Sequence, residues 1–314
     1  MTFPGGCALG RRPVNLHLYA LRCLGAEVQE TERGVRCTAR RLRGGTIDFP
    51  ISSVGATENA ILAACGAAGE TVIRGAAREP EIIDLQRFLC RAGFRVTGAG
   101  TSVITVLGGR GKSRVGHRIM SDRIVAATYL CAGAITGGEV ELRGLRPEDQ
   151  GPVLRVLEDM GCTLRRGNDF LRLQGPALLR SPGEIVARPF PGFPTDVLPL
   201  MMALSCTAKG TTVFHDLVFE NRYRHAGGLT AMGAEILVDG RRAVVRGRQL
   251  HGAEAYATDL RGGAALVLAG LAAEGETRVW DEGHLSRGYT GLDSQLCALG
   301  AAVSREESVC PTGR

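Results

Sequence analysis

A cysteine and the arginines that follow it are the first residues in the chain whose types and spacing could do chemistry. Cys7 lies in the stretch FPGGCALGRRP, after Gly5 and Gly6 and before Arg11 and Arg12. Two glycines permit a sharp or movable turn, and nearby arginines favour a thiolate or a readily donated proton. The stretch therefore predicts a loop whose thiol takes part in acid–base or nucleophilic chemistry.

A carboxylate and three arginines further along the chain could complete such a site. Asp196 ends the proline-rich stretch RPFPGFPTD, whose stiff backbone would hold a general base accurately. Arg222 in FENR, Arg261 in ATDLR and Arg287 in SRGY each lie just outside a predicted helix or strand. Arginine is the preferred bidentate partner of carboxylate and phosphate, so these residues favour an anionic small molecule as the ligand.

The elements that would position these residues repeat along the chain. An apolar helix, a glycine at its C-terminus and a strand recur five times, and four of the five copies continue into a β-hairpin. A helix of small apolar residues followed by a lone strand alternates with this pattern. A period of about 68 residues indicates one supersecondary unit copied several times. The five helix-ending glycines are Gly25, Gly93, Gly161, Gly233 and Gly300.

The small-residue helices are expected to begin with a hydroxyl residue and an acid, the residues that cap helix N-termini. Capping alone would explain each pair, but aligned helix N-termini would also favour anions. The chain holds five copies of the first pattern and four of the second, which predicts that it starts in the middle of a unit and lacks material before Met1. The four expected starts are Thr57-Glu58, Ser121-Asp122, Thr195-Asp196 and Thr258-Asp259.

Composition narrows the class of protein. Of 314 residues, 44% are apolar, and no apolar run is long enough to span a membrane. The N-terminus carries no signal-peptide pattern, so the expected location is the cytoplasm. The net charge is +6, but the arginines are scattered and aromatics are few, which argues against nucleic acid as a partner.

The cysteines do not have the CxxC spacing that would predict a metal site. Six cysteines in apolar helical patterns are expected to be buried: Cys23, Cys65, Cys90, Cys131, Cys206 and Cys297.

The motifs together resemble the enolpyruvyl transferase family, and within it the members that use UDP-N-acetylglucosamine as acceptor. PGGCALGRRPV, SVGATEN, AAREPEIIDL, SDRI, PFPGFPTD, VFENRYRH, ATDLR and SRGY follow the family's order and spacing. The resemblance implies a mixed α/β fold of two lobes, each built from βαβαββ units, with the ligands between the lobes. Residues 1–120 would form an incomplete first lobe with the cysteine loop, and residues 121–314 a nearly complete second lobe.

The resemblance also implies a reaction and residue roles. Enolpyruvyl passes from phosphoenolpyruvate to the 3-hydroxyl of UDP-N-acetylglucosamine by addition and elimination, the step that opens peptidoglycan synthesis, with no cofactor. Cys7 would protonate C3 of phosphoenolpyruvate, and Asp196 would take the hydroxyl proton. Residues matching the anion-binding positions are Arg12, Arg222, Arg261 and Arg287. Those matching the nucleotide-sugar contacts are Arg12, Pro13, Val14, Asn15, Leu16, Ser53, Val54 and Val218.

Several departures from the family pattern leave two alternatives open. A Lys-Asn pair at the phosphoenolpyruvate site has no counterpart, Asn15 replaces an Asp, and Gly262 and Gly263 are expected to loosen the helix start after Arg261. The chain could accordingly be a non-catalytic remnant that binds a nucleotide sugar. It could also be the sister enzyme that uses shikimate 3-phosphate, against which PGGC and FENR argue.

Overall fold

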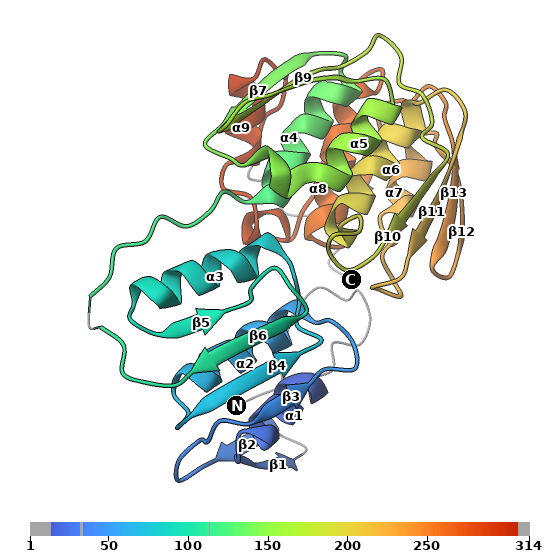
Figure 1. Ribbon diagram of the computed structural model, residues 1–314. Helices are drawn as coiled ribbons and strands as arrows, with labels where there is room; N and C mark the ends of the chain where they lie inside the picture. The colour runs from blue at the N-terminus through green and yellow to red at the C-terminus, as the bar shows by residue number, and fades with distance from the viewer. Residues whose placement is uncertain (1–13, 32–33, 113, 307–314) are drawn as a thin grey trace. The chain divides into compact units, whose positions relative to one another are not determined.

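The computed structural model describes residues 14–31, 34–112 and 114–306 and divides the chain into two compact units. Unit 1 runs to Met120 and includes the short segment Pro189–Pro191. Unit 2 comprises Ser121–Arg188 and the chain from Gly192 onward (Figure 1).

Glycines end the helices of the first repeated pattern, as the sequence predicts. Gly25, Gly93, Gly161, Gly233 and Gly300 have φ angles between 88° and 100°, the left-handed region that closes a helix and that L side chains avoid. The helices are α1 (Asn15–Cys23), α2 (Val54–Cys65), α3 (Pro80–Arg91), α4 (Arg123–Ile135), α5 (Gly151–Asp159), α6 (Leu198–Thr207), α7 (Ala226–Ala231), α8 (Leu260–Ala272) and α9 (Leu292–Ala298). Short 3₁₀ turns are η1 (Pro147–Gln150), η2 (Thr195–Val197) and η3 (Leu285–Arg287).

The strands confirm the predicted repeat of a lone strand followed by a hairpin. In unit 1 the sheet order is β3-β4-β6-β5, and in unit 2 the same arrangement recurs as β10-β11-β13-β12. In each, the first two strands are parallel and joined through a helix, and the remaining pairs are antiparallel. Further sheets are β7-β9-β8, the parallel pair β14-β15 and the hairpin β1-β2. The strands are β1 (Glu27–Thr31), β2 (Gly34–Thr38), β3 (Thr46–Asp48), β4 (Glu70–Arg74), β5 (Arg95–Thr97), β6 (Val103–Leu107), β7 (Glu139–Arg143), β8 (Thr163–Arg166), β9 (Phe170–Gln174), β10 (Glu184–Ala187), β11 (Thr211–Asp216), β12 (Glu235–Asp239), β13 (Arg242–Arg246), β14 (Glu254–Tyr256) and β15 (Arg278–Trp280).

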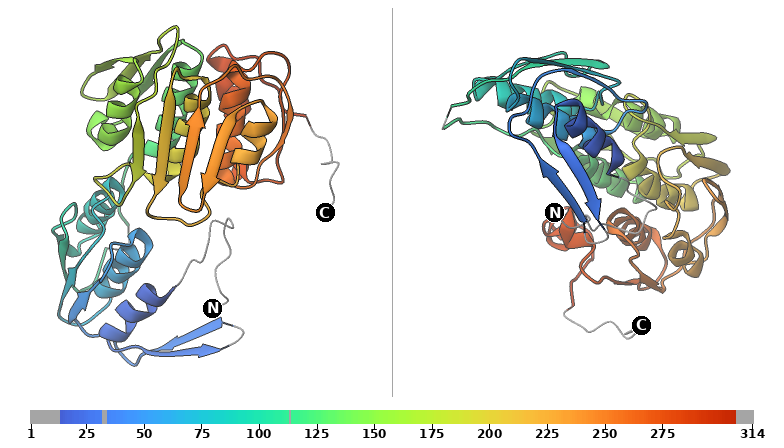
Figure 2. Two further views of the ribbon diagram at one scale, coloured as in Figure 1. Left: turned by 90° about the vertical axis from the view of Figure 1, so that its right-hand side faces the viewer. Right: turned by 90° about the horizontal axis from the view of Figure 1, so that it is seen from below.

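The core of unit 2 is formed by three helices that pack against one another, α4, α6 and α8. Their sequences are apolar on all sides, and nearly every residue of α4 and α6 is buried. The β10–β13 sheet covers them on one side, as the yellow-to-orange strands in the left view of Figure 2 show. Each large aliphatic side chain buried in this way contributes about 1.5–3 kcal/mol. The helices therefore give the segments at their N-termini a rigid base.

Two of the expected helix starts are wrong, and the difference matters for the site. Helix α2 begins one turn earlier than Thr57, because Ser53 Oγ accepts from the Ala56 backbone N–H at 3.4 Å and caps the helix. Thr195 and Asp196 form the 3₁₀ turn η2 and do not cap α6, so both side chains are available for other partners. The acids of the other two pairs do cap: Asp122 caps α4, and Asp259 caps α8.

The cysteines are only partly where the helical patterns place them. Cys65, Cys131 and Cys206 are buried, and burial raises the pKa of Cys65 to about 11 and that of Cys206 to about 12. Cys23 is only half-buried and Cys90 and Cys297 are exposed, contrary to expectation, because all three lie near the C-terminal ends of helices that bury only one face. Within the described ranges, the structure has no helix of the length and apolarity that crossing a bilayer requires.

Candidate active site

Unit 2 brings Asp196, Arg222 and Arg261 together from three separate segments. Asp196 lies in η2, Arg222 follows strand β11, and Arg261 lies in the first turn of α8. Arg222 Nη2 donates to Asp196 Oδ1 at 2.8 Å, and Arg261 Nε lies 3.5 Å from Asp196 Oδ2. The Asp196 side chain remains 40% exposed, whereas those of Arg222 and Arg261 are 0% and 11% exposed. A reachable carboxylate thus has one buried guanidinium on each oxygen.

Arg222 is held on several sides, but one of its donors has no partner in the part of the chain that the structure describes. Its Nε donates to Thr195 Oγ1 at 3.1 Å and lies 3.5 Å from Asp216 Oδ2. Its guanidinium carbon lies 4.9 Å from the centre of the Phe219 ring, a cation–π contact. Among the described residues, its buried Nη1 has no hydrogen-bond partner. A buried charged donor without a partner is costly, and an anionic ligand would satisfy it.

Arg261 is arranged in a similar way. Its guanidinium carbon lies 5.3 Å from the centre of the Tyr289 ring, and its buried Nη1 also has no hydrogen-bond partner in the described part of the chain. Burial opposes its charge, but Tyr289 and Asp196 outweigh that effect and raise the pKa of Arg261. The phenol of Tyr289 is itself fixed by the Thr128 hydroxyl at 2.9 Å. Arg261 thus remains a cation in a largely water-free position.

The two glycines after Arg261 do not loosen the start of α8, contrary to expectation. A Cβ on Gly262 would lie 2.8 Å from the Cβ of His225 and 2.8 Å from Asp259 Oδ2, and one on Gly263 would lie 2.9 Å from the Cβ of Ala257. The backbone N–H groups of Arg261 and Gly262 both donate to Asp259 Oδ1 at 3.0 Å. Glycine is present because neighbouring atoms leave no room for a side chain, and the capped helix start is firm.

His225 packs beside this helix start, and its burial predicts that the protein loses stability in acid. Burial, with Arg222 nearby and partly offset by Asp259, lowers the pKa of His225 to about 4 from 6.5. As pH falls from 6.5 to 4, the unfolded chain would take up a proton that the folded chain does not, so the free energy of unfolding should drop by about 3 kcal/mol. Urea unfolding across this range measures the drop, and His225→Leu should show a shallower slope. Equal slopes in both proteins would contradict the prediction.

The remaining predicted site residues lie in different places. Val218 is 39% exposed and donates its N–H to Asp216 at 2.7 Å, so it lies in the Arg222 loop. Arg287 lies exposed at the end of η3, two residues before Tyr289. Cys7, Arg12 and Pro13 lie outside the described residues.

In unit 1, the predicted nucleotide-sugar residues gather at the starts of α1 and α2. Val14 precedes α1, and Asn15 and Leu16 open it. Ser53 caps α2 and Val54 opens it. The two helices pack together, and a Cβ on Gly55 would lie 3.3 Å from the His17 ring. The two segments that the sequence assigns to one ligand are therefore neighbours within this unit.

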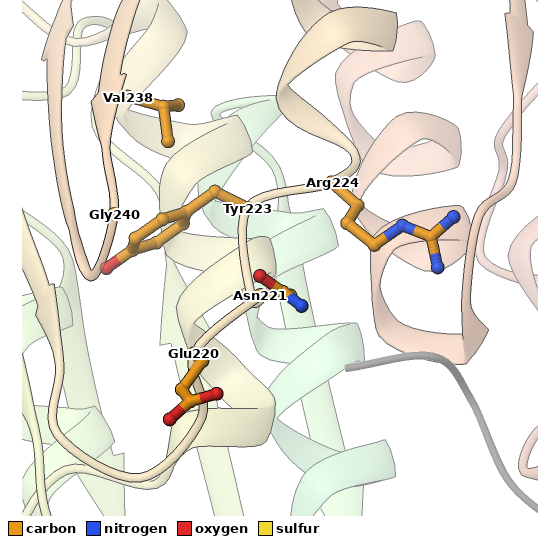
Figure 3. A pocket seen from close by; sticks show the side chains of 6 residues that line it. All are labelled: Glu220, Asn221, Tyr223, Arg224, Val238 and Gly240. Atoms are coloured by element: carbon orange, nitrogen blue, oxygen red, sulfur yellow. The ribbon is translucent and has the colours of Figure 1, made fainter. Parts of the chain in front are cut away.

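A pocket of about 310 Å³ lies beside the Arg222 loop but is separate from the Asp196 group. Figure 3 shows the Tyr223 ring reaching toward Gly240 in the β12–β13 turn, whereas Arg224 points the other way. Glu220 at its edge pairs with Arg241 at 3.2 Å. The loop thus buries Arg222 and Tyr223 and leaves Asn221 and Arg224 exposed. The lining residues are Glu220, Asn221, Tyr223, Arg224, Val238 and Gly240.

Sequence reasoning missed four residues that contact the arginines: Thr195, Asp216, Phe219 and Tyr289. Thr195 looks like a helix cap, and Phe219 and Tyr289 look like ordinary aromatic residues, the first within VFENRYRH and the second at the end of SRGY. Asp216 carried the one usable signal, because an acid at the last position of an alternating strand, TTVFHD, is placed on the buried face of β11. Its partner could not be read from the sequence.

Comparison with known proteins gives a consistent result. The profile of the EPSP synthase (3-phosphoshikimate 1-carboxyvinyltransferase) family matches residues 1–296. A UDP-N-acetylglucosamine 1-carboxyvinyltransferase of Zymomonas mobilis is 49% identical over 308 residues, which cover 97% of this chain and 72% of the relative. UDP-N-acetylglucosamine 1-carboxyvinyltransferase 2 of Caldanaerobacter subterraneus is 45% identical over 97% of this chain and 73% of its own length.

Solved structures agree with the fold. The enolpyruvyl transferase NikO from Streptomyces tendae superposes with a TM-score of 0.84 at 28% identity, over 94% of this chain and 73% of that chain. EPSP synthase from Acinetobacter baumannii superposes with a TM-score of 0.71 at 24% identity, which supports the fold alone. The predicted mixed α/β architecture of repeated units is confirmed.

Proposed function

Because this chain belongs to the enolpyruvyl transferase family, we propose that its substrates are phosphoenolpyruvate and UDP-N-acetylglucosamine. The product would be the 3-enolpyruvyl ether of the sugar, with release of phosphate. Relatives that carry the UDP-N-acetylglucosamine name are 42–49% identical to it, which supports this acceptor over shikimate 3-phosphate. The step would be the first committed reaction of peptidoglycan synthesis and would take place in the cytoplasm.

The observation that carries the proposal is the half-exposed carboxylate of Asp196 between two buried guanidiniums, each with an Nη1 that has no hydrogen-bond partner among the described residues. The free donors suit the carboxylate and phosphate oxygens of phosphoenolpyruvate. The exposed face of Asp196 suits removal of a proton from an acceptor hydroxyl. Two cations on one carboxylate would also hold it in a fixed orientation while it acts.

In the proposed reaction, the sugar 3-hydroxyl adds to C2 of phosphoenolpyruvate, Asp196 takes the hydroxyl proton, and Cys7 gives a proton to C3. The tetrahedral adduct then loses phosphate from C2 and a proton from C3, which restores the double bond as an enol ether. Arg222 and Arg261 would bind the anionic groups, together with Arg12 and Arg287. The nucleotide sugar would contact Val218 and the residues of unit 1, namely Arg12, Pro13, Val14, Asn15, Leu16, Ser53 and Val54.

Phosphate release with each acceptor tests the proposal. The assay uses this chain and an extended chain, defined as this chain joined to the 28% of the Zymomonas mobilis relative that it does not match. The extended chain should release phosphate from phosphoenolpyruvate with UDP-N-acetylglucosamine and not with shikimate 3-phosphate. The proposal would be overturned if the extended chain released phosphate only with shikimate 3-phosphate. It would also be overturned if the extended chain released phosphate with neither acceptor.

The proposed role of Cys7 predicts selective labelling by a small epoxide. Arg11 and Arg12 beside Cys7 in the sequence favour its thiolate, whereas burial raises the pKa of Cys65 to about 11. Mass spectrometry of the extended chain after a short exposure should find the label on Cys7, and Cys7→Ala should remove it. The exposed Cys37 gives the matched control, because Cys37→Ala should leave labelling unchanged. Undiminished labelling of Cys7→Ala would refute the assignment.

A further inference from the structure

Asp216 is a fully buried carboxylate whose partners all belong to the segments that form the proposed anion site. Its Oδ1 accepts from the backbone N–H groups of Val218 at 2.7 Å and Phe219 at 2.9 Å. Its Oδ2 accepts from the Thr195 hydroxyl at 2.6 Å and lies 3.5 Å from Arg222 Nε. Both Asp216 and the Arg222 side chain are 0% exposed. Neither carboxylate oxygen reaches solvent, so the group is placed to organise its neighbours.

The four partners that Asp216 has among the described residues fix the loop that carries Arg222. The two backbone bonds fold the chain directly after β11 and place the Phe219 ring, on which the Arg222 guanidinium stacks at 4.9 Å. The pairing at Nε occupies one edge of the guanidinium. Because that group is planar and rigid, holding Nε fixes the directions of the other two nitrogens, Nη1 and Nη2.

Thr195 links the two acids that Arg222 contacts. Its hydroxyl donates to Asp216 and accepts from Arg222 Nε at 3.1 Å. It is also the residue directly before Asp196, whose Oδ1 accepts from Arg222 Nη2. The Thr195 hydroxyl therefore fixes the position of the η2 turn, which carries Asp196, relative to the loop after β11, which carries Arg222.

We propose that Asp216 and Thr195 are positioning residues, which hold Arg222 at Nε so that Nη2 meets Asp196 and Nη1 meets an oxygen of the phosphate or carboxylate ligand. This inference rests on the proposed function, in that it takes the Asp196 group as the anion site. Neither residue would touch the ligand, and both would act through the orientation of Arg222. Asp216→Asn would keep an acceptor for the loop but turn an NH₂ group toward Arg222 Nε, so the orientation of Arg222 should be lost.

Paired substitutions at Thr195 test the proposal in the chain as it stands, with inorganic phosphate titrated by NMR as the probe. Thr195→Val keeps the shape and removes the hydroxyl, so phosphate affinity should fall roughly tenfold. Thr195→Ser restores the hydroxyl, and its affinity should return to within about twofold of the starting protein. Asp216→Asn should weaken binding at least as much as Thr195→Val.

A matched control separates positioning from a loss of packing. Thr212 is buried, whereas Thr195 is half-buried, and the Thr212 hydroxyl bonds to Ser181 Oγ at 2.9 Å, away from the arginines. Thr212→Val should lower the thermal midpoint about as much as Thr195→Val but leave phosphate affinity unchanged. Equal affinity losses in both valine variants, or an unchanged affinity in Thr195→Val, would overturn the inference. If the starting protein binds no phosphate, or Arg222→Gln binds it equally well, the proposal that the Asp196 group binds anions is wrong.

Discussion

The Arg222→Gln variant is expected to lose about 3–5 kcal/mol of unfolding free energy and about a hundredfold in kcat/KM. The stability loss follows because the substitution leaves Asp216 buried without its cation. The activity loss follows because the donors to Asp196 and to the proposed ligand disappear together. Urea unfolding of this chain measures the first quantity, and phosphate release by the extended chain measures the second.

A surface arginine gives the control for this prediction. Arg248 pairs with Glu235 where both side chains are more than 40% exposed, so Arg248→Gln should cost less than about 1 kcal/mol and leave turnover intact. Arg222→Lys keeps the charge but cannot donate along two edges, and it should recover more stability than activity. A full recovery of activity by lysine would show that charge alone, without orientation, suffices at this position.

The Asp196→Asn variant is expected to lower turnover by about 10²–10⁴ while affinity for UDP-N-acetylglucosamine changes only a few-fold. The amide keeps the size of the side chain and one oxygen for the arginines, but it cannot accept the acceptor's hydroxyl proton. Saturating both substrates isolates kcat, and titration calorimetry with the nucleotide sugar measures the affinity in the extended chain.

Glu220 offers a matched carboxylate for this second prediction. It lies in the Arg222 loop and pairs with the exposed Arg241, away from the Asp196 group. Glu220→Gln should therefore preserve turnover. If Asp196→Asn lost affinity and turnover to the same extent, the residue would serve binding or structure instead of proton removal.

Most of the fold could be predicted from the sequence because short local patterns specify the repeated unit. The positive φ at Gly25, Gly93 and Gly161 and the hairpins that follow need only neighbouring residues to form. The wrong helix starts at Thr57 and Thr195 have a shared physical cause. A hydroxyl residue before an apolar helix suits a cap, but which hydroxyl caps depends on where tertiary packing starts the helix.

The candidate site was predictable only as far as residue type and local rigidity reach. Asp196 could be identified because it ends a stiff, proline-rich stretch. Arg222 and Arg261 could be identified because each lies just outside a predicted helix or strand. The two arginines reach the Asp196 carboxylate only because α6 and α8 pack together, and no local sequence pattern specifies that packing. Asp216 escaped notice for the same reason, since its partners come from a preceding turn and a following loop.

Deuterium incorporation tests the central claim, addition and elimination with Asp196 as the base, most directly. The extended chain is incubated in D₂O with phosphoenolpyruvate and UDP-N-acetylglucosamine, and the product is examined by NMR. Because C3 would gain a solvent deuteron and then lose one of three hydrogens, the vinyl group of the enol ether should carry deuterium, and Asp196→Asn should form little product. An enol ether without deuterium at C3, or product formed equally fast by Asp196→Asn, would contradict the account.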